Sequence, residues 1–143
     1  MNTFPKQEKL THKKLIEKTF SNGSRVKAFP LLAFKAFHRK RGAAEIQVMF
    51  TVGKKRFKKA VDRNRIKRLL KEAWRLQKGA MELSIPDGEQ LSLIVVYTGN
   101  AIPSFEEAQK KIKKLIRRLE NEHPLPQSTD AIAKAQNKPE QDA

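Results

Sequence analysis

The sequence predicts an α/β (α+β) fold, a two-layer sandwich in which a small central sheet packs against helices. Two segments, about 31–38 and 45–52, alternate apolar and polar residues with the period of a β-strand. Two others, 59–77 and 105–119, repeat apolar residues at helical spacing. With a first helix and a further strand, the predicted order is α-β-β-α-β-α, which suits one sheet with helices against it.

Length and composition indicate one globular domain. The chain has 143 residues, and its net charge of +16 and isoelectric point near 10.3 are high for an ordinary small domain. The sequence contains no cysteine, which excludes disulfides and thiolate metal sites. The most apolar run, 93–97, is far shorter than the roughly 18 residues of a membrane span, and the first residues do not resemble a signal peptide. We therefore expect a cytoplasmic protein that does not enter a membrane.

The first half of the chain predicts a helix followed by two strands. The helix covers about residues 9–20, and residues 21–24 end it because they tolerate left-handed backbone. The first strand, 31–38, places Leu32 and Phe34 on one face, and a turn at 39–42 follows it. In the second strand, 45–52, Val48 and Phe50 alternate with polar or less apolar neighbours, which predicts one buried face.

The basic helix, about 59–77 and ended by Gly79, comes next. Its apolar arc is predicted to face the sheet and consists of Ile66, Leu69, Leu70, Ala73 and Leu76, while Trp74 is predicted to pack at its end. A strand at 91–97 follows, and it lies parallel to a neighbour if the basic helix is a crossover. A short fourth strand is possible near 97–102 or 84–85.

A closing helix begins after Pro103. Ser104 and Glu107 have the spacing of a capping box, in which each side chain bonds the other residue's backbone N–H. After His123 the chain has three prolines and few large apolar residues. We therefore expect one domain over residues 1–123 and a disordered tail over 124–143.

Positive charge is concentrated between Lys54 and Arg75. This segment has eleven Lys or Arg against two acids, Asp62 and Glu72, so eleven minus two gives +9 of the chain's +16. A helix face that is only solvated commonly pairs its basic residues with acids one turn away. This face has too few acids for such pairs, so a merely solvated face is a weaker interpretation than a binding surface. A bound polyanion would relieve the repulsion, and the segment therefore predicts a nucleic-acid-binding helix.

The same residues carry a family resemblance. The string from Ala60 to Ala73, which contains Arg63-Asn64-Arg65 and follows a strand ending in Val52-Gly53-Lys54-Lys55, resembles the signature helix of the protein subunit of bacterial ribonuclease P. The similarity extends from about residue 10 to residue 122. It implies a protein that binds a large catalytic RNA and the 5′ leader of precursor tRNA, with cleavage performed by the RNA and Mg²⁺ that the RNA mainly binds. It also implies a left-handed crossover through the basic helix, against the general right-handed rule.

The resemblance assigns roles to individual residues. It places Phe20 and Phe34 in a cleft for the single-stranded leader, although the residues alone favour core packing for both rings. The sequence departs from the family's pattern at Ile16, where an aromatic is frequent, at Gly53, and at the bulky basic linker 56–59. The residues that match the RNA-binding helix and the basic pair before it are Lys54, Lys55, Arg63, Asn64, Arg65, Lys67, Arg68 and Lys71.

No group of residues predicts catalysis by the polypeptide or a metal site within it. The three histidines, His12, His38 and His123, lie far apart in the sequence, and no glycine-rich phosphate loop is present. The alternative is a structural rRNA-binding protein with no part in cleavage. A duplex-DNA binder is disfavoured because a strand, not a supporting helix, precedes the basic helix, and a metal-dependent nuclease is disfavoured because carboxylates are not clustered.

Overall fold

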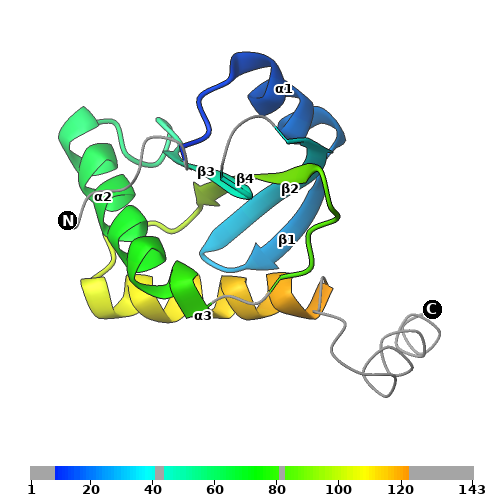
Figure 1. Cartoon of the computed structure of the whole chain (residues 1–143). Coiled ribbons are helices and arrows are strands. Elements are labelled where there is room, and N and C mark those ends of the chain that lie inside the picture. The colour runs from blue at the N-terminus through cyan, green and yellow to red at the C-terminus, as the bar shows by residue number, and fades with distance from the viewer. Residues whose placement is uncertain (1–8, 41–43, 81–82, 123–143) are drawn as a thin grey trace, which may run out of the picture.

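The computed structural model describes residues 9–40, 44–80 and 83–122 (Figure 1). In chain order the described part consists of α1 (Lys13–Asn22), β1 (Ser24–Ala28), β2 (Leu31–Arg39), β3 (Ile46–Val52), α2 (Ala60–Gln77), a short 3-10 turn (Lys78–Ala80), β4 (Glu89–Tyr97) and α3 (Phe105–Glu122). The predicted helices and the three main predicted strands are all present, and most boundaries agree within a few residues. The predicted tail 124–143 and part of the turn at 39–42 lie outside the described residues.

The four strands form one mixed sheet in the order β1-β2-β4-β3. β2 pairs antiparallel with both β1 and β4, whereas β3 and β4 are parallel neighbours joined through α2. The basic helix is therefore a crossover, and the prediction that the strand after it lies parallel to a neighbour is confirmed.

The position of the fourth strand was predicted wrongly. Residues 84–85 and 98–102 contain no strand, and the additional strand is β1, in the segment after the first helix. Only Val26 and Ala28 are buried in its five residues, so its alternation is too short and too charged to be recognised. Its conformation is decided by pairing along β2, from Ser24 opposite Lys35 to Ala28 opposite Leu31.

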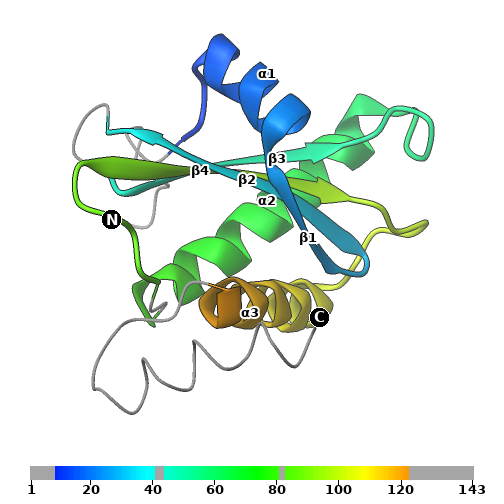
Figure 2. The same cartoon turned by 90° about the vertical axis from the view of Figure 1, so that its right-hand side faces the viewer.

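Helices cover both faces of the sheet, so the two-layer prediction is wrong. Figure 2 shows α1 on one side of the strands, with α2 and α3 together on the other. The physical reason lies in β4, where Leu93 and Val95 belong to the core beneath α2 and α3, whereas Ile94, between them, lies on the other face of the strand. All three side chains are 0% exposed. A strand that is apolar on both faces requires cover on both.

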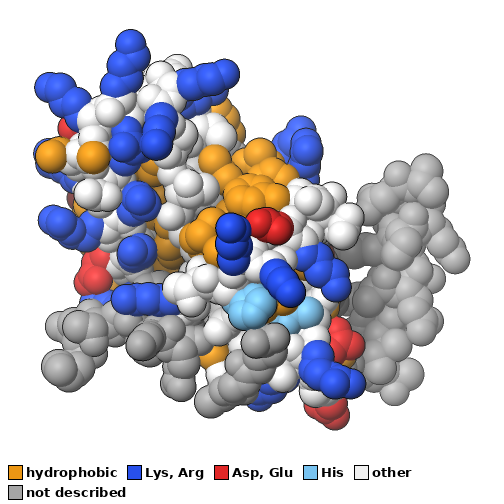
Figure 3. All heavy atoms as spheres, turned by 90° about the horizontal axis from the view of Figure 1, so that it is seen from above, with side chains coloured by type: hydrophobic (Ala, Val, Ile, Leu, Met, Phe, Trp, Pro, Cys, Tyr) orange, Lys and Arg blue, Asp and Glu red, His pale blue; other side chains and the backbone are white. Residues whose placement is uncertain are grey.

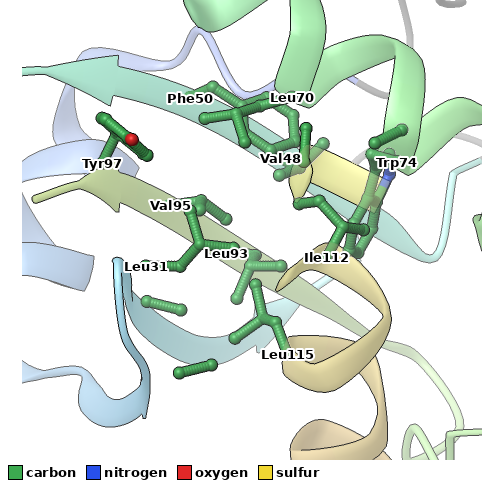
Figure 4. Close-up of a cluster of buried hydrophobic side chains, with 14 of the residues drawn as sticks. Leu31, Val48, Phe50, Leu70, Trp74, Leu93, Val95, Tyr97, Ile112 and Leu115 are labelled. Atoms are coloured by element: carbon green, nitrogen blue, oxygen red, sulfur yellow. The ribbon is translucent and has the colours of Figure 1, made fainter. Parts of the chain in front are cut away.

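The main core lies between the sheet and the pair α2 and α3 (Figure 4). Trp74 is buried as predicted, and its ring packs edge-on against Phe50 with centroids 6.3 Å apart. Leu76 does not belong to this core and is 51% exposed, contrary to prediction. The last turn of α2 meets α3 instead, where Gln77 Nε2 donates to the Gln109 carbonyl at 2.9 Å.

The ends of the helices show which local signals determine them. The predicted capping box is confirmed, since Ser104 N–H donates to Glu107 Oε1 and Glu107 N–H to Ser104 Oγ, both at 3.1 Å. Gly23 ends α1 with φ of −73°, so left-handed backbone is not the reason for glycine there. A Cβ at Gly23 would collide with the Thr19 carbonyl and lie 2.8 Å from that of Lys35. Close approach of α1 to β2 therefore requires glycine.

The two residues Lys9 and Leu10, which precede α1, contact the edge of the sheet at β3. The helix begins at Lys13 because Lys9 forms a bridge with Val48 and Leu10 N–H donates to the Val48 carbonyl at 3.0 Å. Leu10 is buried by this contact. Within the described ranges, no helix is long and apolar enough to cross a membrane.

Candidate nucleic-acid interface

The outer face of α2 carries the predicted signature residues. Ile66, Leu70 and Ala73 point into the core and are 0% exposed, so the opposite side of the helix, which carries Arg65 and Arg68, faces solvent. In Figure 3, Lys and Arg side chains crowd the side of the molecule on which α2 lies. The predicted residues that are exposed are Lys54, Lys55, Asn64, Arg65, Arg68 and Lys71, whereas Arg63 and Lys67 are half-buried.

Arg63 has a partner inside the protein that sequence reasoning missed. Its Nη1 donates to the carbonyls of Phe57 at 2.7 Å and Lys58 at 2.9 Å. The N-cap residue of α2, Lys59, makes no side-chain capping bond, so Arg63 holds the loop that leads into the helix. In the same loop, Arg56 Nη1 donates to Asn100 Oδ1 at 2.6 Å. These contacts orient the loop that carries the two predicted lysines, 54 and 55, relative to α2.

Like charges gather near the middle of α2. The pKa of Lys71 is lowered, first by partial burial and then by the positive charges of Lys9 and Lys67. By contrast, Arg75 is neutralised, since it forms a two-pronged ion pair with Glu72 one turn earlier. The positive charge of α2 that has no acidic partner among the described residues therefore lies before Glu72, at the end of the helix near the loop 53–59. A bound anion there would stabilise these charged side chains.

Two phenylalanines predicted for a cleft meet on the α1 face of the sheet. Phe20 from α1 and Phe34 from β2 contact edge to face, with ring centroids 5.1 Å apart at 61°. The Arg25 guanidinium of β1 lies 5.4 Å from the centroid of the Phe34 ring, within cation–π range. We call Phe20, Phe34 and Arg25 the aromatic cluster. In Figure 3, which views the molecule from the α1 side, hydrophobic side chains reach the surface among Lys and Arg.

The aromatic cluster lies outside the main core. Phe20 is 41% exposed and Phe34 is half-buried, whereas Leu31 and Ala33 on the other face of β2 are at most 1% exposed. Simple core packing, which the residues alone favoured for both rings, does not describe Phe20 at this exposure. The tertiary structure also adds Arg25, for which the sequence contained no signal.

The two histidines of the described residues, His12 and His38, make structural hydrogen bonds. His12 caps α1 by accepting from Leu15 N–H, and His38 hydrogen-bonds the fully buried Ser92 through Nε2. Because Ser92 is buried, a substrate cannot reach its hydroxyl, and the His38–Ser92 pair does not provide an accessible nucleophile. Among the described residues, no group of three or more His, Asp or Glu side chains could hold a metal ion.

A mixed sheet with a basic helix on one side and an exposed cluster of aromatic and cationic side chains on the other defines an RNA-binding α/β protein. Comparison with known proteins agrees, because the family model for ribonuclease P matches residues 4–120. The chain belongs to the ribonuclease P protein family. It is the protein subunit of this ribonucleoprotein endoribonuclease, which processes the 5′ leader of precursor tRNA.

Individual relatives agree with this assignment. The chain is 37% identical over 139 residues to the "Ribonuclease P protein component" of Chlorobaculum tepidum, covering 90% of both chains. It is 33% identical over 136 residues to that of Chlorobium phaeobacteroides, covering 83% of this chain and 89% of the relative. The solved ribonuclease P protein of Thermotoga maritima has the same fold, with a TM-score of 0.60 at 23% identity, over 79% of this chain and 98% of that one.

Proposed function

We propose that the exposed face of α2 and the Lys54–Lys55 loop bind the catalytic RNA of ribonuclease P, while the aromatic cluster takes the single-stranded 5′ leader. The observation that carries the proposal is the aromatic cluster itself. Two half-exposed rings and a guanidinium lie on the face of the sheet opposite the main core. Family membership implies the RNA subunit as a partner, and the roles of particular residues are our assignment.

The chemistry of α2 suits a folded RNA backbone. Arg65, Arg68 and Lys71 are exposed along a rigid helix, and no acid of the described residues neutralises them. Partial burial lowers the pKa of Lys71 first, and repulsion by Lys9 and Lys67 lowers it further; phosphates bound there would offset this repulsion. Asn64 adds an amide that can both donate and accept. Arg63 contributes indirectly in this scheme, because its guanidinium holds the loop carbonyls.

The chemistry of the aromatic cluster suits a single strand of variable sequence. Every base has a π face, so stacking on Phe20 or Phe34 does not depend on which base is present. Arg25 is exposed beside Phe34 and is available to a phosphate of the same strand. A leader that differs from one tRNA to the next requires this kind of tolerance.

Cleavage itself is assigned to the RNA subunit. Mg²⁺ bound mainly by the RNA would supply the nucleophile and stabilise the leaving oxygen, and the protein positions the RNA and the leader. We further propose that the protein acts in the cytoplasm, that residues 1–123 belong to a single domain, and that the β3–α2–β4 crossover has the left hand that the family resemblance implies.

Replacement of Phe34 by Leu tests the leader assignment. The variant keeps apolar volume but lacks the π face, and stacking is worth about 1–3 kcal/mol per base. Binding of precursor tRNA to the reconstituted holoenzyme should therefore weaken roughly fivefold to a hundredfold, with mature tRNA, which lacks the leader, bound as before. Equal weakening for both tRNAs with a lower melting temperature would make Phe34 a core residue. Protein and Mg²⁺ without the RNA subunit should leave precursor tRNA intact.

A further inference from the structure

A second basic surface lies on α3 and is not part of either site described above. Residues 110–118 consist of six Lys or Arg and three apolar residues, with no acid. The apolar ones, Ile112, Leu115 and Ile116, are at most 6% exposed and pack into the core. The basic side chains therefore point away from the sheet, and those that are exposed are Lys110, Lys113, Lys114, Arg117 and Arg118.

Internal partners do not account for this surface. Glu106 and Glu107 lie only in the first turn of α3, and of the basic residues Lys110 and Lys111 are near enough to influence the pKa of Glu107. Like charges three and four residues apart destabilise a helix. The run therefore costs stability in the free protein, and beyond the influence of Glu107 on Lys110 and Lys111 no ion pair among the described residues compensates it. Of the basic residues in this run, Lys113, Lys114, Arg117 and Arg118 make no ion pair or hydrogen bond with the described part of the chain.

The charge density matches a nucleic acid. Nine residues of α-helix span about 13 Å at 1.5 Å per residue, so six cations give one positive charge per roughly 2 Å. Duplex nucleic acid has one negative charge per about 1.7 Å of its axis. The α3 surface is thus complementary in sign and similar in spacing to a duplex backbone.

The side-chain types distinguish base-paired RNA from a single strand. Residues 110–118 include no aromatic ring on which an unpaired base could stack, in contrast to the aromatic cluster. Duplex RNA is recognised instead through phosphates and 2′-hydroxyls. A hollow of about 410 Å³ at the crossing of α2 and α3 offers amide and ammonium groups that can bind phosphates and 2′-hydroxyls. The residues that line it are Gln77, Gln109, Lys110, Lys113 and Glu106.

The location separates this surface from the leader. Figure 2 shows α3 on the opposite side of the sheet from α1, which carries Phe20. The aromatic cluster and the outer face of α3 are therefore separated by the sheet, whereas the hollow adjoins the end of α2. We propose that the outer face of α3 binds the backbone of a base-paired segment of the catalytic RNA, as a second contact beyond α2. This inference rests on membership of the ribonucleoprotein and not on the leader assignment.

Charge removal in the full-length protein tests the proposal. Lys114, Arg117 and Arg118 are replaced together by Gln, and the matched control replaces three other exposed cations, Lys13, Arg39 and Lys40, by Gln. Affinity for the cognate catalytic RNA is then measured against salt concentration. Each phosphate that the protein no longer binds should make the logarithmic salt slope shallower by about 1, so we expect a change of about 2–3 for the α3 variant and less than half of that for the control. The melting temperature should not fall, because repulsion is relieved.

The absence of cysteine allows a second readout. A single Cys introduced at Lys114 can carry a hydroxyl-radical probe, and a Cys at Arg65 serves as the reference position on α2. The Lys114 probe should cut both strands of a base-paired segment of the catalytic RNA at sites different from those cut from Arg65. An unchanged salt slope, an equal change in the control, or cuts confined to the leader would overturn the proposal. The ratio of precursor to mature tRNA binding should stay unchanged in the α3 variant, which separates this result from failure of the leader assignment.

Discussion

Replacement of Arg63 by Ala should destabilise the protein, although this residue belongs to the family's RNA-binding signature. Its Nη1 donates to two loop carbonyls, those of Phe57 and Lys58, at 2.7 and 2.9 Å. Hydrogen bonds from a charged donor contribute about 1.5–3 kcal/mol each when well buried. Arg63 is half-buried, so we expect a total loss of about 1–3 kcal/mol.

The loss is measurable as a melting temperature. For a domain of this size, each kcal/mol corresponds to roughly 4 °C, so Arg63→Ala should melt about 4–12 °C lower by circular dichroism or calorimetry. Arg63→Lys should recover only part of this, because one ammonium cannot reproduce the geometry of the guanidinium. Affinity for the catalytic RNA should also fall, since the loop that carries Lys54 and Lys55 loses its anchor.

Arg65→Ala is the matched control for Arg63. Arg65 is exposed two residues further along the same helix and makes no hydrogen bond or ion pair with the described part of the protein. It should lose affinity for RNA while its stability changes by less than about 0.5 kcal/mol. If Arg63→Ala melts at the same temperature as Arg65→Ala, the two carbonyl contacts do not stabilise the loop and the reasoning fails.

Three other predictions follow from the structure. Replacing Arg68 by Ala should make the salt dependence of RNA affinity shallower by about 1 from an overall logarithmic slope of about −4 to −5, and an unchanged slope measured by titration would show that α2 is only solvated there. In a denaturant titration, Gly23→Ala should lower the free energy of unfolding by about 1–3 kcal/mol, because the new methyl group would clash with the Thr19 and Lys35 carbonyls. Gly53→Ala, which has open space around it, should leave the free energy of unfolding almost unchanged. The pKa of Glu107 is held below its ordinary value, first by the hydrogen bond from the Ser104 backbone N–H. The carboxylate therefore stabilises the fold at pH values above the ordinary glutamate pKa, and this stabilisation is lost as pH falls through the lowered pKa. The melting temperatures of wild type and Glu107→Ala should differ at neutral pH and converge in acid, and a difference that is the same at every pH would exclude this cause.

Local patterns were sufficient for much of the fold. The period of Val48, Phe50 and Val52 and the helical spacing of Ile66, Leu70 and Ala73 are confirmed by burial. Such patterns are readable because each residue's face depends only on its own element. The capping box at Ser104 and Glu107 is also confirmed, since both partners lie within four residues. The basic character of α2 and the family resemblance followed from the same contiguous stretch.

Contacts between distant segments decided the rest. β1 is a strand because it pairs with β2, and Leu76 is exposed because α2 ends against α3 beyond the sheet. Neither fact depends on local periodicity, so neither could be predicted from it.

The candidate site divides in the same way. The sequence by itself determined which residue types form the basic helix, because charge and apolar spacing are properties of one contiguous segment. Only the tertiary structure placed Arg25 over Phe34 and gave Arg63 its carbonyl partners. It also placed α3 on the side of the sheet opposite α1, because sheet pairing and helix packing bring together residues that are far apart along the chain.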